Sequence, residues 1–159
     1  MRRKKKYFKR ESNVPAPLEF SFQRRARFGE VDAMAVMWHG HYATLFEEAS
    51  TELRRMCGLG YEDFFSAEVF APIVQLHVDY YSSLVLDELF TVTARMIWTD
   101  AARINIEYEV FKEDGSVGAT GYTVQLFSSA MTGEPCFTLP PLLENQQDRW
   151  KKGLLGGDK

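Results

Sequence analysis

The sequence predicts an α+β fold in which an antiparallel β-sheet wraps around one long central helix. One strongly amphipathic helical pattern occurs, over residues 42–56, and most of the chain after it alternates apolar and polar residues as half-buried strands do. One helix must bury its apolar stripe, and a run of sequential antiparallel strands supplies a face to receive it. Because one helix cannot cover both faces or both edges of a sheet, we expect two copies to pair at an edge.

The first two elements are a strand and the long helix. Leu18, Phe20 and Phe22 alternate with polar residues, and the apolar phase continues to Phe28, so we expect a strand over 18–28. The helix shows the i, i+3, i+4, i+7 spacing at Tyr42, Leu45, Phe46, Ala49, Leu53 and Met56. Gly58 and Gly60 close it.

The second half of the chain is mostly strand. After a linking segment at 61–68, of at most one helical turn, alternation predicts strands over 73–81, 90–98, 104–110 and 117–128. An Asp-Gly pair within 112–116 indicates a hairpin turn between the last two. We further expect a short last strand from Cys136 to Leu139 and a short helix over 142–150.

Length and composition indicate one globular domain over 18–150. Residues 1–17 are expected to be a basic, mobile extension ending in two prolines, and 151–159 a flexible tail. The seven cationic residues of the first ten positions could touch anionic lipid or nucleic acid, but a solvated tail is the simpler interpretation: Arg2, Arg3, Lys4, Lys5, Lys6, Lys9 and Arg10. The net charge of −3 gives no sign of nucleic-acid binding by the domain itself.

The apolar runs, the start of the sequence and the cysteine pattern together predict the cytoplasm as the location. No apolar run is long enough to span a membrane, and no apolar segment follows the basic start as in a secretory signal. Cys57 and Cys136 belong to no CxxC pair and are expected to be free thiols.

Residues 28–42 break both periodic patterns and are the candidate site. Gly29 and Gly40 bracket this stretch, which we interpret as a structured loop that leads into the helix. It contains two of the three histidines, His39 and His41, and Asp32 seven residues before the first of them.

This stretch and the order of elements resemble the hotdog-fold thioesterases, specifically the 4-hydroxybenzoyl-CoA and Tol–Pal-associated acyl-CoA thioesterase group. The matching residues are Phe28-Gly29-Glu30-Val31-Asp32, Val36-Met37-Trp38-His39-Gly40-His41-Tyr42 and Phe46-Glu47-Glu48-Ala49. In element order the resemblance covers about residues 20 to 140. Ala35 replaces the usual loop glycine, and His41 replaces an Asn or Ser. Because alanine tolerates a positive φ poorly, Ala35 raises the question whether the loop keeps the same path.

The resemblance implies hydrolysis of an acyl-CoA thioester to a free acid and coenzyme A. It makes Asp32 the catalytic carboxylate, as nucleophile or as general base; the alternative is a turn or helix-capping aspartate. His39 would polarise the thioester oxygen through its backbone N–H, near the positive end of the helix. Its side chain could orient water or protonate the leaving thiol, and a purely structural histidine is the alternative.

Further residues of the stretch are candidates for substrate binding. Trp38, Met34 and Met37 could line an acyl pocket or simply belong to the core. Gly40 and His41 lie where the thioester end would be held. Glu47 could share in the chemistry, although a surface or interface acid is the simpler interpretation. Arg95, Arg103 and Lys112 are candidates for the phosphates of coenzyme A, and a solvated strand face is the alternative.

No metal or redox cofactor is implied. Asp32, His39 and His41 could in principle bind zinc, but His77 lies on a distant strand and supplies no convincing further ligand. Two rival functions remain: a hotdog dehydratase acting on hydroxyacyl thioesters, and a non-catalytic protein that binds acyl thioesters. The expected partner is an acyl-CoA or acyl-carrier-protein thioester, and the expected assembly is a homodimer or homotetramer. The sequence does not identify the acyl group.

Overall fold

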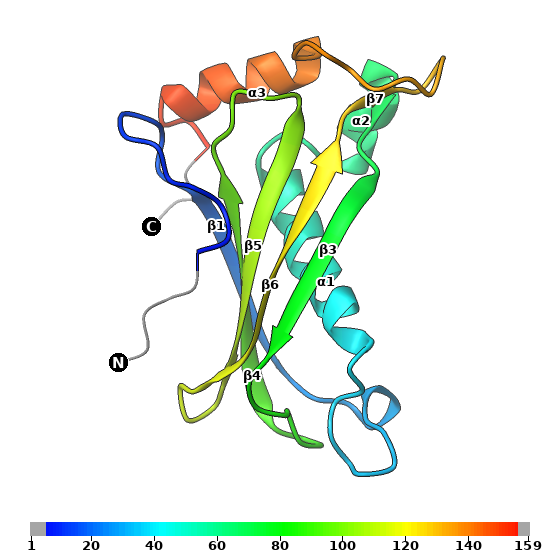
Figure 1. Cartoon of the computed structure of the whole chain (residues 1–159), viewed down its shortest axis with the longest axis vertical. Coiled ribbons are helices and arrows are strands. Elements are labelled where there is room, and N and C mark those ends of the chain that lie inside the picture. Colours follow the sequence, from blue (N-terminus) through cyan, green and yellow to red (C-terminus); the bar gives the residue numbers. More distant parts are fainter. Residues whose placement is uncertain (1–5, 156–159) are drawn as a thin grey trace.

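The computed structural model describes residues 6–155, so positions 2–5 of the basic start and positions 156–159 of the tail lie outside it. Five strands form one antiparallel sheet in the order β1-β4-β5-β6-β3. They are β1 (Leu18–Arg25), β3 (Ile73–Tyr80), β4 (Leu89–Ile97), β5 (Arg103–Lys112) and β6 (Val117–Leu126). Helix α1 (His41–Met56) lies against one face of this sheet (Figure 1). The expected α+β architecture, with one long helix against an antiparallel sheet, is confirmed.

Helix α1 buries the apolar stripe that its spacing predicted, except for Met56 at its end, which is 45% exposed. Four side chains of this stripe are at most 1% exposed: Leu45, Phe46, Ala49 and Leu53. The Phe46 ring stacks on Tyr108 of β5, with ring centroids 4.3 Å apart. A Cβ atom at Gly121 of β6 would lie 2.5 Å from the Phe46 ring and 2.2 Å from the His77 carbonyl oxygen. Glycine at this position therefore allows the helix and the neighbouring strand to approach the sheet closely.

Smaller elements close the end of the sheet opposite the loop that precedes α1 (Figure 1). Segment 61–68, expected to contain at most one turn, forms the seven-residue helix α2 (Tyr61–Ala67). Helix α3 (Pro141–Lys151) falls where a short helix was expected, and its Trp150 ring packs edge-on against Trp98 at 5.1 Å. The two-residue strands β2 (Val69–Phe70) and β7 (Ser128–Ser129) pair with each other. In residues 6–155, no helix is long and apolar enough to cross a bilayer.

Two predictions about the strands are wrong. The strands after α1 do not all pair in sequence order, because β3 pairs with β6 at one edge of the sheet while β4 pairs with β1 and β5. The chain must therefore cross from one edge toward the other over residues 81–88. The expected strand from Cys136 to Leu139 is also absent: the Cys136 amide donates to the Phe127 carbonyl at 2.8 Å, but the chain then turns into α3.

Part of the expected N-terminal extension lies against the outer face of the sheet, opposite α1 (Figure 1). The amides of Tyr7 and Phe8 donate to Glu107 Oε1 at 2.8 and 2.9 Å. Arg10 forms an ion pair with the same carboxylate at 2.6 Å. The Tyr7 hydroxyl donates to Asp79 at 2.6 Å. Residues 7–10 thus contact the domain at its outer face, and the proposed boundary at residue 17 stays a prediction.

Candidate active site at the start of α1

Asp32 occupies a tight turn between the 3-10 helix η1 (Phe28–Glu30) and α1. Its amide donates to the Val36 carbonyl at 2.9 Å, and the Ala35 amide donates back to the Asp32 carbonyl at 2.9 Å. Ala35 has a φ of 59°, which lies in the left-handed region that favours glycine. The turn therefore requires a positive φ at Ala35 and accepts alanine there at a cost of about 1–2 kcal/mol in backbone energy.

The Asp32 carboxylate combines a structural contact with access to a cavity. Its Oδ1 accepts a hydrogen bond from the Met34 amide at 2.8 Å, as expected of the alternative role, a turn aspartate. Among residues 6–155 no hydrogen bond reaches Oδ2. The half-buried side chain borders a cavity of about 330 Å³ that His39, Tyr42 and Tyr80 also line. One oxygen therefore holds the turn while the other remains free for a ligand or water.

His39, two residues before α1 begins, lies on this cavity, and Gly40 is the next residue in the chain. Gly40 is the N-cap residue, and no side chain caps the helix. The Tyr80 hydroxyl donates to the His39 carbonyl at 2.7 Å, which fixes the plane of the peptide that carries the Gly40 N–H. In the described part of the chain, neither the His39 nor the Gly40 N–H donates a hydrogen bond to protein. These donors, with the positive end of the helix dipole, suit a developing oxyanion.

Two tyrosines of the cavity act as hydrogen-bond donors rather than bases. Burial raises the pKa of Tyr42 above its usual value, and burial raises that of Tyr80 as well. Their rings meet edge-on at 5.1 Å, at the junction of α1 and β3. Both hydroxyls therefore stay protonated at neutral pH.

Trp38 covers the start of the helix from outside. Its indole lies 5.1 Å from the His39 ring and 5.4 Å from the His41 ring, measured between centroids. A Cβ atom at Gly40 would lie 2.2 Å from this indole, so glycine is needed for the indole to lie there. Trp38 is 47% exposed. The indole and His41 border the peptide donors but do not line the cavity that holds Asp32.

The remaining predicted substrate-binding residues are dispersed. Met37 is buried and lines the Asp32 cavity, whereas Met34 is 77% exposed and does not. Glu47 lies further along α1, is exposed, and lines other cavities than the one that contains Asp32. Within one protomer the structure thus brings together Asp32, His39 and Met37, and leaves Met34 and Glu47 outside.

Arg24 connects the loop that carries Asp32 to β1 and α1. Arg24 of β1 donates to both carboxylate oxygens of Glu30, at 2.6 and 2.9 Å, and to Glu48 of α1 at 3.0 Å. The Glu30 carbonyl in turn accepts the Trp38 amide at 2.9 Å. Burial would raise the pKa of Glu30, but hydrogen bonds from Arg24 and the Arg27 amide outweigh it and lower the pKa. Glu30 therefore stays ionised and joins η1, β1 and α1.

The crossing segment after β3 forms the rest of the site, and it carried no signal in the sequence. Tyr81, Ser82 and Ser83 line the Asp32 cavity. The Met37 amide donates to the Leu84 carbonyl at 2.7 Å, which ties the loop to this segment. A run of small and aromatic residues between two strands matches no motif. Only the pairing of β3 with β6 brings it next to Asp32.

The three cationic candidates for coenzyme A lie in different places. Lys112 donates to the Ser83 carbonyl at 2.9 Å and so lies at the rim of the Asp32 cavity. Arg95 is paired with Glu19 and Glu109 on the outer face of the sheet. Arg103 lines a small cavity beside α3. Lys112 is therefore the one of the three that contacts a residue lining the Asp32 cavity, and it also pairs with Glu88 at 3.6 Å.

The fold and this site define an enzyme of the thioesterase class, and comparison with known proteins agrees. Residues 26–147 match the model of the thioesterase-like superfamily, so the chain belongs to that family and has the hotdog fold. A 1,4-dihydroxy-2-naphthoyl-CoA hydrolase of Synechococcus elongatus is 26% identical over 132 residues, which are 82% of this chain and 93% of that protein. The acyl-CoA thioesterase YbgC of Haemophilus influenzae is 29% identical over 94 residues, 58% of this chain and 69% of that protein.

Solved structures show the same fold. A DHNA-CoA thioesterase of Staphylococcus aureus superposes with a TM-score of 0.68 at 29% identity, covering 76% of this chain and 80% of its own. A second S. aureus protein, solved in complex with CoA, superposes with a TM-score of 0.76 at 20% identity, covering 93% of this chain and 92% of its own. The second likeness concerns the fold alone.

Proposed function

We propose that the protein hydrolyses acyl-CoA thioesters, with Asp32 as the reacting carboxylate. The observation that carries the proposal is that a carboxylate with a free oxygen and His39, whose amide is unbonded, border one cavity just before the uncapped start of α1. A thioester placed between them would present its carbonyl carbon to Asp32 and its oxygen to the amides. The names of the relatives, which include two kinds of acyl-CoA hydrolase, support this substrate class.

A carboxylate can act in hydrolysis by two routes, and the atoms balance in both. As general base, Asp32 takes a proton from water while the water oxygen attacks the carbonyl carbon. The oxyanion forms at the amides, the C–S bond breaks, and the leaving thiolate receives the proton from Asp32. As nucleophile, Asp32 displaces the thiolate to form an anhydride, which water then cleaves. Both routes yield one carboxylic acid and free coenzyme A.

The more specific predictions made from the sequence are also part of this proposal. The motif at 28–49 supports placement in the 4-hydroxybenzoyl-CoA and Tol–Pal-associated group. Lys112, at the rim of the cavity, is the residue we propose for a phosphate of coenzyme A. The side chain of His39, on the same cavity as Asp32, is proposed to orient water. The two free cysteines support the cytoplasm as the compartment.

We also propose that two copies associate along β3. This strand forms one edge of the sheet, and its apolar side chains Ile73, Val74 and Leu76 are at least half exposed. An unprotected apolar edge strand pairs readily with another strand. An isologous contact between two β3 edges would extend the sheet and cover these side chains. A tetramer would require a further surface.

The test is release of free thiol from a panel of acetyl-, medium-chain, long-chain and aromatic acyl-CoA thioesters. The proposal predicts release from at least one of them by the wild-type protein. Water addition to an enoyl-CoA without thiol release would instead establish the dehydratase. Binding of the thioesters without any release would establish the binding protein. Repeating the panel with acyl-carrier-protein thioesters identifies the carrier.

A further inference from the structure

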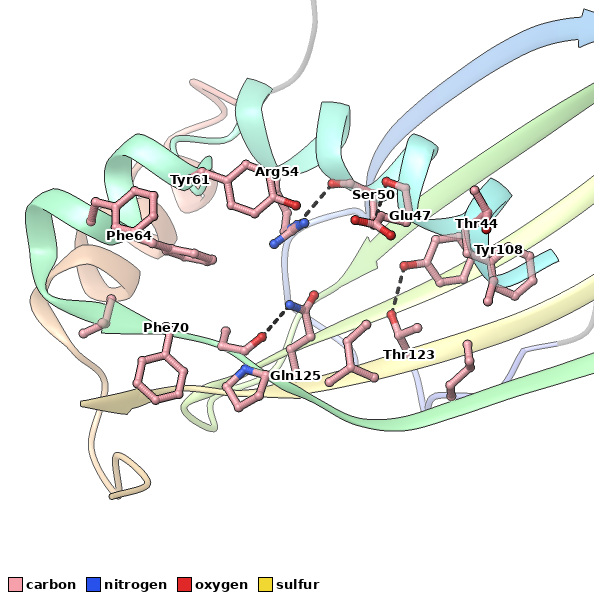
Figure 2. Close-up of a pocket in the computed structure, with 18 residues that line it drawn as sticks. Thr44, Glu47, Ser50, Arg54, Tyr61, Phe64, Phe70, Tyr108, Thr123 and Gln125 are labelled. Carbon is pink, nitrogen blue, oxygen red and sulfur yellow. Dashed lines mark hydrogen bonds between the residues drawn. The ribbon is translucent and has the colours of Figure 1, made fainter. Parts of the chain in front are cut away.

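A second and larger cavity lies further along α1, between that helix, α2 and the strands β3 and β6 (Figure 2). Its volume is about 490 Å³. Aromatic and aliphatic side chains form much of its wall: Tyr61, Phe64, Phe65, Phe70, Ile73 and Leu76. Its lining on α1 runs from Ala43 to Arg54 and shares no residue with the lining of the Asp32 cavity. Such a space suits the apolar body of a small organic ligand.

The unusual member of this wall is Arg54. Its side chain is buried, with only 7% of the residue exposed, and Figure 2 shows the guanidinium pointing from α1 into the space above Gln125. Its Nε donates to the Ser50 carbonyl at 3.3 Å, and its guanidinium carbon lies 5.6 Å from the centre of the Tyr61 ring. Among residues 6–155 no carboxylate lies within ion-pair distance of it. A buried guanidinium with no anion is costly, so its unused N–H groups favour an anionic ligand.

Within residues 6–155, the other buried polar side chains of the cavity already have partners. The Tyr108 hydroxyl bonds with Thr123 Oγ1 at 2.9 Å. Gln125 Nε2 donates to the Ala71 carbonyl at 2.7 Å. Glu47 also lines the cavity, but its side chain is exposed to solvent and forms no ion pair with Arg54. Among the buried polar side chains of this cavity, Arg54 is therefore the one whose terminal nitrogens are left for a ligand.

We propose that this cavity binds the carboxylate end of an acyl group whose body is apolar, through the guanidinium of Arg54. The substrate class is then the mono-CoA thioester of a dicarboxylic acid, and this inference rests on the proposed thioester hydrolysis. A guanidinium and a carboxylate can form two parallel hydrogen bonds, which gives both strength and orientation. The apolar side chains of the wall would contact the remainder of the acyl group.

The test compares pairs of CoA thioesters of equal chain length, one ending in a carboxylate and one in a methyl group, across a series of lengths. The wild-type protein should favour the carboxylate member at its best length by roughly 10- to 100-fold in kcat/KM, the range of a charged hydrogen bond. Arg54→Gln should abolish this preference, because an amide side chain carries no charge to pair with the carboxylate. Arg54→Lys should keep only part of it, because an ammonium lacks the planar fork. Arg55→Gln, which removes the exposed neighbouring arginine paired with Glu52, is the matched control and should retain it.

Binding of free dicarboxylates separates this inference from the proposed reaction. By calorimetry, the wild-type protein should bind adipate or suberate more tightly than the diol of equal length, which carries no carboxylate, and Arg54→Gln should remove the difference. Equal rates and equal binding for the two members of each pair would overturn the inference while the hydrolase proposal stands. Absence of hydrolysis with preferential dicarboxylate binding would overturn only the hydrolase. A fall in oligomeric mass on Arg54→Gln would show that Arg54 pairs with a second copy, and would also overturn it.

Discussion

Ala35 shows what a single backbone position requires of the catalytic turn. The sequence marked it as a departure from the family pattern, and the structure places it at a φ of 59°. Replacing Ala35 with glycine should raise the free energy of unfolding by up to about 1 kcal/mol, because glycine has no Cβ to clash in this region. Ala35→Val should lower it by about 1–2 kcal/mol, since a branched side chain tolerates a positive φ worst. Urea denaturation of both variants measures the difference, and a valine variant as stable as the wild type would contradict this account of the turn.

Arg24 and Glu30 make stability depend on pH at this site. The pKa of Glu30 is lowered, so its ion pair stabilises the fold above the ordinary carboxyl pKa of 4.5 and loses this contribution as pH falls through the lower, folded value. Arg24→Met should lower the free energy of unfolding at pH 7 by about 1.5–3 kcal/mol. The gap from the wild type should shrink in acid.

The control for this pair is Arg25→Met, which removes an arginine whose side chain, among residues 6–155, donates one hydrogen bond, to the Asp87 carbonyl oxygen at 2.8 Å. Denaturation at a series of pH values gives both curves. A gap for Arg24→Met that is the same at pH 3 and pH 7 would show that Glu30 is not the group responsible.

Among the elements, the sequence predicted α1 to within one residue but did not predict the partner of β3. The stripe of α1 is a local pattern, and its apolar spacing has one satisfactory arrangement against a sheet. Strand pairing depends on contacts between distant residues, so alternation over 73–81 gave the strand but not its neighbour. For the same reason Asp32 and His39 could be predicted from one continuous stretch, whereas Tyr80, Ser82 and Ser83 could not.

The N-terminal segment is the element whose role the sequence least revealed. A basic run predicts a solvated tail, yet Arg10 pairs with Glu107, a glutamate that is only 4% exposed. Arg10→Met should destabilise the protein by about 1.5–3 kcal/mol, because Glu107 would keep only the two amide donors of Tyr7 and Phe8. Hydrogen exchange should also show faster exchange at those two amides. Lys9→Met, at an exposed position, is the control. Equal stability of Arg10→Met and wild type would indicate a mobile extension instead.

At the scale of the whole molecule, β3 is the edge through which we propose that two copies associate. Val74 is 50% exposed on this strand. Val74→Lys should place two like charges on facing edges and reduce the measured mass from twice 18.3 kDa to the single-chain value, with a parallel fall in activity. Light scattering after size-exclusion chromatography measures the mass. Phe137→Lys, at a residue that is 94% exposed away from β3, should leave it unchanged. A wild-type protein of single-chain mass would contradict the proposed association.

The proposed hydrolysis depends on the carboxylate of Asp32 acting on the thioester at the uncapped start of α1. The most direct measurement is kcat/KM for the best acyl-CoA substrate, determined from thiol release. It is made for Asp32→Asn and for Asp148→Asn, which changes an exposed acid on α3. We expect Asp32→Asn to lose at least about 100-fold, since an amide is neither a base nor a nucleophile here, and Asp148→Asn to match the wild type. Thiol release by a folded Asp32→Asn at the wild-type rate would contradict the central claim.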